Sequence, residues 1–135
     1  MGKCSEGACS SRRLVWSDTI DATNRINPCD PRDLCGVAGQ TSSEIVASHA
    51  IGATLLKAFN TVPMAWIADA SPSKPKTVLF VSGDDANAKS ALSEVLEEVG
   101  FAAVDVGSLA IGGSLQQVGG PLAALNLVLM DRFVL

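Results

Sequence analysis

Tyrosine is absent from this 135-residue chain, which has one histidine, two tryptophans and four phenylalanines. A hydrophobic core therefore has to be built from aliphatic side chains, and the hydrophobic fraction of 47% can supply it. Basic residues are also scarce, with no cluster beyond Arg12 and Arg13, and the formal net charge is -4. Because nucleic-acid binding depends largely on lysine and arginine neutralising phosphates, we expect no nucleic-acid partner.

Long apolar runs are lacking as well. The longest lies around residues 122–130 and is interrupted by Asn126, whereas a helix that crosses a bilayer needs about 20 apolar residues. The first residues carry no apolar block of the kind found in secretory signals. We therefore expect a cytoplasmic protein without membrane contact.

The sequence also lacks the common motifs of hydrolysis and phosphate transfer. It has no G-x-S-x-G, no H-E-x-x-H, no G-x-x-x-x-G-K-[ST], and no second histidine for a catalytic dyad. We expect no catalytic side chain. Hydride transfer between two bound cofactors suits such a chain, because it requires positioning and a dry pocket rather than a nucleophile or a general base.

Four cysteines, Cys4, Cys9, Cys29 and Cys35, all lie within the first 35 residues. Their spacings, C-x4-C and C-x5-C, differ from the C-x2-C of zinc ribbons. We predict free thiols in a reducing compartment and no metal site. A zinc site and a disulfide are the alternatives.

Hydrophobic patterning predicts alternating strands and helices after a disordered leader at residues 1–13. Strands are expected at 14–20, 53–59, 77–81 and 101–106. Helices are expected after the capping box Thr41-Ser42-Ser43-Glu44, after Pro63, at 86–99 with Asp84 or Asp85 as its cap, and from Pro121 to about 130. The glycine-rich segment 107–120 is expected to be a loop. The strand–helix–strand unit at 77–106 suits a crossover between parallel strands, which predicts an α/β layered fold.

The expected last helix predicts self-association. On a helical wheel Leu122, Leu125 and Leu129 form one stripe, and apolar residues occupy the other directions as well. A helix that is apolar nearly all round has to be buried nearly all round. We therefore expect a homo-oligomer, with a single internal core helix as the alternative.

Five motifs occur in a recognisable order: Ile20-Asp21-Ala22-Thr23-Asn24, Gln40-Thr41-Ser42-Ser43-Glu44, Lys57-Ala58-Phe59-Asn60-Thr61, Val81-Ser82-Gly83-Asp84-Asp85 and Leu115-Gln116-Gln117-Val118-Gly119-Gly120-Pro121-Leu122. Over about residues 18–130 the chain thereby resembles the deazaflavin (coenzyme F-420)-dependent NADP oxidoreductases and the cytosolic domain of membrane metalloreductases. The resemblance implies a partial Rossmann-like fold with mainly parallel strands and a C-terminal helix. It assigns 14–70 to the C-terminal portion of a dinucleotide-binding domain and 71–135 to a substrate or dimerisation part.

The resemblance also implies a cofactor site for NADP and, as hydride acceptor, a deazaflavin. Asn24 would lie beside the nicotinamide end, Thr61 and Pro63 would shape the pocket where the two cofactors meet, and Leu115 and Gln116 would close it. Three of these positions have a simpler interpretation. Asn24 could cap a turn, Thr61 could be the N-cap of the helix at 63–68, and Gln116 could be a solvated loop amide.

Two departures from the family remain. The Gly-x-Gly-x-x-Gly turn that holds the pyrophosphate is missing, and Arg25 stands where the family usually has proline. We therefore expect a truncated chain that, by itself, binds NADP weakly or not at all. The alternatives are an inactive, self-associating remnant and a partner chain that supplies the loop.

Overall fold

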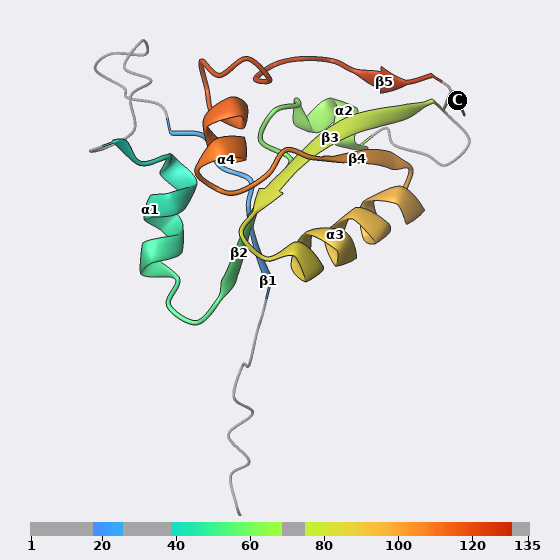
Figure 1. Cartoon of the computed structure of the whole chain (residues 1–135). Helices are drawn as coiled ribbons and strands as arrows, with labels where there is room; N and C mark the ends of the chain where they lie inside the picture. The colour runs from blue at the N-terminus through green and yellow to red at the C-terminus, as the bar shows by residue number, and fades with distance from the viewer. Residues whose placement is uncertain (1–17, 26–38, 69–74, 131–135) are drawn as a thin grey trace, which may run out of the picture.

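The computed structural model describes residues 18–25, 39–68 and 75–130. The expected leader at 1–13 and all four cysteines lie outside the described residues, so the prediction of free thiols stays a prediction. The elements are the strands β1 (Asp18–Asp21), β2 (Thr54–Lys57), β3 (Lys76–Gly83), β4 (Phe101–Asp105) and β5 (Val128–Leu129), and the helices α1 (Ser42–His49), α2 (Met64–Ala68), α3 (Ala86–Glu98) and α4 (Ile111–Gln116). Figure 1 shows their arrangement.

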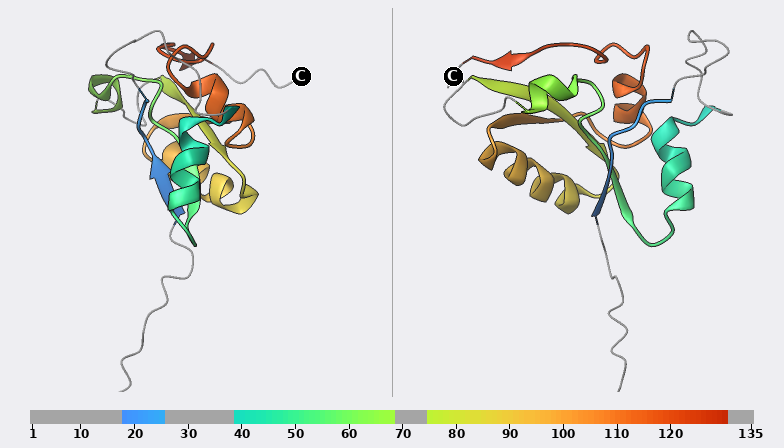
Figure 2. Two further views of the ribbon diagram at one scale, coloured as in Figure 1. Left: turned by 90° about the vertical axis from the view of Figure 1, so that its left-hand side faces the viewer. Right: turned by 180° about the vertical axis from the view of Figure 1, so that it is seen from behind.

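The strands form one mixed sheet in the order β1-β2-β3-β4, and β5 pairs with β3. β1 runs parallel to β2 and β3 runs parallel to β4, whereas β3 is antiparallel to both β2 and β5. The parallel pairings join four and five residue pairs and the antiparallel ones two each. The predicted α/β class with mainly parallel strands is confirmed. Figure 2 shows from behind how β1 and β2 lie side by side.

The helix starts follow from local capping. In α1 the Thr41 hydroxyl accepts from the Glu44 amide at 3.2 Å, and the Thr41 amide donates to the Glu44 carboxylate at 2.7 Å. In α3 the Asp85 carboxylate accepts from the Ala88 amide at 2.9 Å. These bonds satisfy backbone amides that a first helical turn leaves unpaired. The capping box and the aspartate cap are both confirmed.

Side chains of β3 alternate between the two faces of the sheet. Leu79 and Val81 enter a buried cluster with Leu96 of α3 and Phe101 of β4. Ser82 projects to the opposite face, where α4 packs against β3. The strand–helix–strand crossover predicted at 77–106 is therefore confirmed, and its helix covers one face while α4 lies on the other.

The expected helix from Pro121 is wrong. Residues 121–124 form a turn and β5 follows, with the Val78 amide donating to the Leu127 carbonyl at 2.8 Å. Ala124 has a φ of 60°, which a right-handed helix does not tolerate. The last helix is instead α4, inside the glycine-rich segment expected to be a loop.

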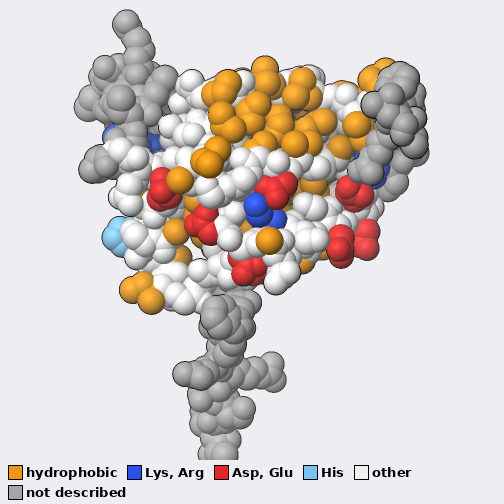
Figure 3. Space-filling view, in the orientation of Figure 1, with side chains coloured by type: hydrophobic (Ala, Val, Ile, Leu, Met, Phe, Trp, Pro, Cys, Tyr) orange, Lys and Arg blue, Asp and Glu red, His pale blue; other side chains and the backbone are white. Residues whose placement is uncertain are grey.

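Self-association through the expected helix thereby loses its structural basis, although a homo-oligomer as such stays a prediction. Leu127 and Val128 are partly exposed along the segment that leads into β5. Figure 3 shows apolar side chains gathered along the top of the molecule, where this segment runs. Within the described ranges, no helix combines the length and the apolar character needed to cross a membrane.

Candidate functional site

A pocket of about 470 Å³ lies where β1 and β2 end. Its lining comes from the loops after these strands and from the segment after α4: Asn24, Asn60, Thr61, Val62, Pro63, Val118, Gly119, Gly120, Ala123 and Ala124. Carboxyl ends of neighbouring parallel strands meet at one edge of a sheet, so the two loops are brought together by topology. All ten lining side chains are uncharged.

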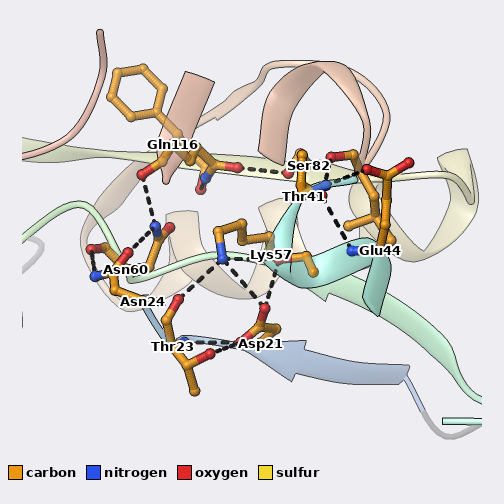
Figure 4. Close-up of polar contacts among 12 residues, drawn as sticks. Asp21, Thr23, Asn24, Thr41, Glu44, Lys57, Asn60, Ser82 and Gln116 are labelled. Carbon is orange, nitrogen blue, oxygen red and sulfur yellow. Dashed lines mark hydrogen bonds and ion pairs between the residues drawn. The ribbon is translucent and has the colours of Figure 1, made fainter. Parts of the chain in front are cut away.

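Two asparagines from different loops bind each other beside the pocket (Figure 4). The side-chain amide of Asn24 donates to the backbone carbonyl of Asn60 at 2.8 Å, and the side-chain amide of Asn60 donates to Asn24 Oδ1 at 3.0 Å. The Asn60 amide also donates to the Gln116 carbonyl at 2.9 Å. These bonds join the loops after β1 and β2 to the end of α4. The Asn24 side chain thereby contacts a distant loop, which the interpretation as a local turn cap does not predict.

Gln116 is fully buried and fixed at both ends of its side-chain amide. Its nitrogen donates to the Phe80 carbonyl at 2.8 Å, and its oxygen accepts from the Ser82 hydroxyl at 2.6 Å. The interpretation of Gln116 as a solvated amide is thus wrong. Its orientation also places its backbone carbonyl against Asn60.

Two polar atoms beside the pocket are buried without a partner. Among the described residues, neither Thr61 Oγ1 nor Asn60 Oδ1 has a hydrogen-bonding partner. Leaving a buried polar atom unpaired costs about 1–3 kcal/mol. Because Thr61 Oγ1 bonds no helix amide, the interpretation of Thr61 as an N-cap is wrong. A hydroxyl can donate or accept and an amide oxygen can accept, so two residues of the pocket lining carry unused donor and acceptor functions.

The backbone around the pocket is strained. Phe59 and Ala124 have φ values of 65° and 60°, a region that costs a non-glycine residue about 1–3 kcal/mol. The Ala124 amide donates to the Thr61 carbonyl at 3.1 Å across the pocket. Gly119 has a φ of 85°, and a Cβ atom at Gly120 would overlap backbone oxygens of α4. Strain of this kind is typical of functional sites.

A buried ion pair lies beneath the loop that carries Asn24. Lys57 is fully buried, and its ammonium donates to Asp21 Oδ2 at 3.3 Å, to the Thr23 carbonyl at 3.1 Å and to the Ser43 hydroxyl at 2.9 Å. Ser43 donates in turn to Asp21 Oδ2 at 2.6 Å. The ammonium thus uses all three donors, as a charged lysine does.

The two charges of this pair respond differently to burial. Burial alone raises the pKa of Asp21, but hydrogen bonds from Ser43 and Thr23, together with the charge of Lys57, hold it below its usual range. Burial lowers the pKa of Lys57, and the carboxylate of Asp21 opposes this shift. Three hydrogen bonds donated by the ammonium indicate that both groups are charged at neutral pH.

Polar side chains also form a row across one face of the sheet. Asp21 pairs with Lys57 between β1 and β2, and Lys57 pairs with Ser82 between β2 and β3. Paired residues of adjacent strands project to the same face. The row therefore runs under α1 and α4. The ion pair lies at one end, and the hydrogen bond from Ser82 to Gln116 lies at the other.

The structure brings together four of the five residues expected at a cofactor site. Asn24, Thr61 and Pro63 line the pocket, and Gln116 lies directly behind it. Leu115 does not line it, although its carbonyl accepts from the Leu122 amide at 3.0 Å and so helps to shape the following turn.

Sequence reasoning placed Asn60 in a family motif without giving it a role in the site, and it missed Lys57 as a site residue. The lysine within the apolar run of residues 55–59 was the available signal, because a charged residue in a buried strand requires a partner. Among the described residues, no cluster of three or more histidine, cysteine, aspartate or glutamate side chains could hold a metal ion.

Comparisons with known proteins agree with the motifs. No protein-family profile matches the chain. The metalloreductase STEAP3 of Rattus norvegicus is 33% identical over 79 residues, which are 58% of this chain and 16% of that protein. The chain therefore spans a small part of this curated relative.

Two solved structures share the fold. A hypothetical protein from Sinorhizobium meliloti has a TM-score of 0.73 and 44% identity over 84% of this chain and 55% of that chain. A proposed F-420-dependent NADP reductase from Arthrobacter sp. FB24 has a TM-score of 0.56 and 20% identity over 68% of this chain and 43% of that chain, and this likeness concerns the fold alone. The chain is thus Rossmann-like, similar in fold to a proposed NADP reductase and in sequence to a metalloreductase, as its motifs predict.

Proposed function

We propose that the pocket binds the nicotinamide end of NADP(H), within a protein that transfers hydride between NADP and a deazaflavin-type acceptor. The observation that carries the proposal is the pair of buried, unpartnered oxygens, Thr61 Oγ1 and Asn60 Oδ1. A carboxamide has two N–H donors and one carbonyl acceptor, so it can satisfy both atoms. The volume of about 470 Å³ falls within the usual range for small-molecule sites.

The lining supports hydride transfer over acid–base chemistry. None of the ten lining residues titrates near neutral pH, and general acid–base catalysis requires a group that does. A bound nicotinamide supplies the hydride itself, and the protein has to orient it and exclude water. Small and apolar residues, including Val62, Pro63 and Val118, suit this task.

The pocket proposed for the nicotinamide does not account for binding of the dinucleotide's phosphates. The printed sequence contains no Gly-x-Gly-x-x-Gly turn, and backbone amides of such a turn contribute much of the affinity for a dinucleotide. We therefore expect this chain by itself to hold NADPH weakly. The same observation favours a second candidate, a folded module without activity.

Reduced nicotinamide mononucleotide tests the proposal, because it carries the nicotinamide without the adenosine half. In Thr61→Val the dissociation constant for this probe should rise about tenfold, the loss expected from one buried hydrogen bond. The free energy of unfolding without ligand should stay unchanged or rise, because the variant removes an unpaired hydroxyl.

The control is the same exchange at Thr77, which lies in β3 outside the pocket lining. It should leave the dissociation constant unchanged. Equal affinity of the wild type and Thr61→Val, measured by titration monitored with NMR, would overturn the proposal. So would the absence of any binding by the wild type at millimolar probe, and the second candidate would then stand.

A further inference from the structure

We propose that the buried Lys57–Asp21 ion pair is a positioning device that holds Asn24 at the pocket. The pair spans three elements, because Asp21 ends β1, Lys57 ends β2, and both bond Ser43 in α1. The consequence for NADPH binding rests on the proposed function. The effect on the Asn24 side chain does not.

The pair holds the residue before Asn24 at three points. Asp21 Oδ1 accepts from the Thr23 amide at 3.0 Å and from the Thr23 hydroxyl at 2.6 Å, and Lys57 donates to the Thr23 carbonyl at 3.1 Å. The donor and the acceptor of the Thr23 backbone are thereby both bound. Since the Thr23 carbonyl belongs to the peptide unit that leads into Asn24, the backbone of Asn24 is fixed as well.

The position of Asn24 decides whether its amide can meet Asn60. The Asn24 side chain donates to the Asn60 backbone carbonyl at 2.8 Å and accepts from the Asn60 side chain at 3.0 Å. Hydrogen bonds weaken steeply when donor and acceptor move out of line. A small rotation of the Thr23–Asn24 backbone would therefore open the contact and turn the Asn24 amide away from the pocket.

Stability alone does not account for the choice of charged residues. Replacing a buried ion pair with apolar side chains is often neutral or stabilising, because the charges no longer have to be desolvated. Apolar residues, however, could not bond the amide, hydroxyl and carbonyl of Thr23. The pair also makes hydrogen bonds to both Thr23 and Ser43, as an orienting network requires.

The test is the double variant Asp21→Asn/Lys57→Met, which removes both charges and leaves neither unpaired. The measured quantity is the hydrogen-exchange rate of the Asn24 side-chain amide, followed by NMR. The Asn24 signal is assigned as the one that disappears in Asn24→Ser. Exchange should accelerate about tenfold, as expected from the loss of one hydrogen bond. A merely structural role would lower the free energy of unfolding without changing this signal in the folded protein.

The matched control is Lys89→Met/Asp105→Asn, which removes an ion pair of 2.9 Å on the exposed side of α3 and β4. It should leave Asn24 exchange unchanged. Unchanged Asn24 exchange in the folded double variant would overturn the proposal. If the double variant does not fold, Ser43→Ala decides. It removes the hydroxyl that bridges the two charges, and Asn24 exchange should accelerate, whereas no change would overturn the proposal.

Binding of NADPH separates this proposal from the proposed function. If NADPH perturbs pocket signals in the wild type, the double variant should bind it about tenfold more weakly. If the double variant bound NADPH as tightly as the wild type while Asn24 exchange was accelerated, the role of the ion pair in cofactor binding would be overturned. If neither NADPH nor reduced nicotinamide mononucleotide at millimolar concentration perturbs a pocket signal in the wild type, the proposed function fails, and Asn24 exchange still decides whether the ion pair positions this side chain.

Discussion

At the scale of single residues, the carboxylate of Asp21 links the stability of the fold to pH. Burial alone raises its pKa, yet hydrogen bonds from Ser43 and Thr23 bring the folded value below 3.8. A carboxyl group with a lowered folded pKa stabilises the protein at neutral pH, and this contribution is lost as pH falls through the folded value. The lowered pKa of Lys57 affects stability in the alkaline range. It does not change the loss of stability at low pH, the acid limb of the pH profile.

We therefore predict that the free energy of unfolding of the wild type falls as pH drops below about 3.8. Asp21→Asn should show a shallower acid limb in urea titrations between about pH 5 and pH 2. At neutral pH, Asp21→Asn should lower the free energy of unfolding by about 3–5 kcal/mol, because Lys57 is left charged, buried and unpaired. Asp105→Asn is the control. That carboxylate is 52% exposed, and solvent screening makes its contribution small. An acid limb in Asp21→Asn as steep as that of the wild type would contradict the assignment.

Which single residues could be predicted depended on how far their partners lie along the chain. The resemblance places Asn24, Thr61 and Pro63 at one site, and all three line the pocket. The pairing of Asn24 with Asn60 spans 36 residues, and the bond from Ser82 to Gln116 spans 34. Such contacts depend on strand order and register, which a single sequence does not determine.

At the scale of elements, the turn after α4 carries stored strain. Ala124 has a φ of 60°, and its amide is held by the Thr61 carbonyl. Glycine adopts this conformation without a steric cost. This strained turn therefore forms the far wall of the pocket at a cost in stability.

Ala124→Gly should raise the free energy of unfolding by about 0.5–1 kcal/mol, the usual scale of such a backbone effect. Urea unfolding measures the difference. The neighbouring Ala123→Gly is the control. It should lower stability by a similar amount, because Ala123 has no positive φ and glycine adds entropy to the unfolded chain. A loss of stability in Ala124→Gly would show that the strain is absent.

Elements with local signals were predicted well, and elements formed by distant contacts were not. The capping box of α1 and the spacing of α3 lie within each helix. β5 exists because its backbone pairs with the start of β3, so its apolar residues were mistaken for a helix. α4 was missed because glycine usually marks a loop. Here Gly112 lets the helix approach β3, since a Cβ atom would overlap the Ser82 side chain.

At the scale of the whole molecule, three segments that are distant in sequence meet at one edge of the described sheet and form the pocket. The loops after β1 and β2 supply one wall, and the segment after α4 supplies the other. The chain covers 55% of the Sinorhizobium meliloti structure and 16% of the rat metalloreductase. The activity of a whole enzyme is therefore a proposal for this chain, whereas the geometry of the pocket belongs to the chain itself.

The central claim is that this pocket receives a nicotinamide ring, and intermolecular nuclear Overhauser effects test it most directly. With reduced nicotinamide mononucleotide at saturation, ring protons should give cross-peaks to the methyl groups of Thr61 and Val62, which line the pocket. Ser48, exposed on α1, should show none. Cross-peaks to the pocket methyls are the predicted result. Cross-peaks confined to other surfaces would contradict the claim, as would their absence at a probe concentration that saturates the protein.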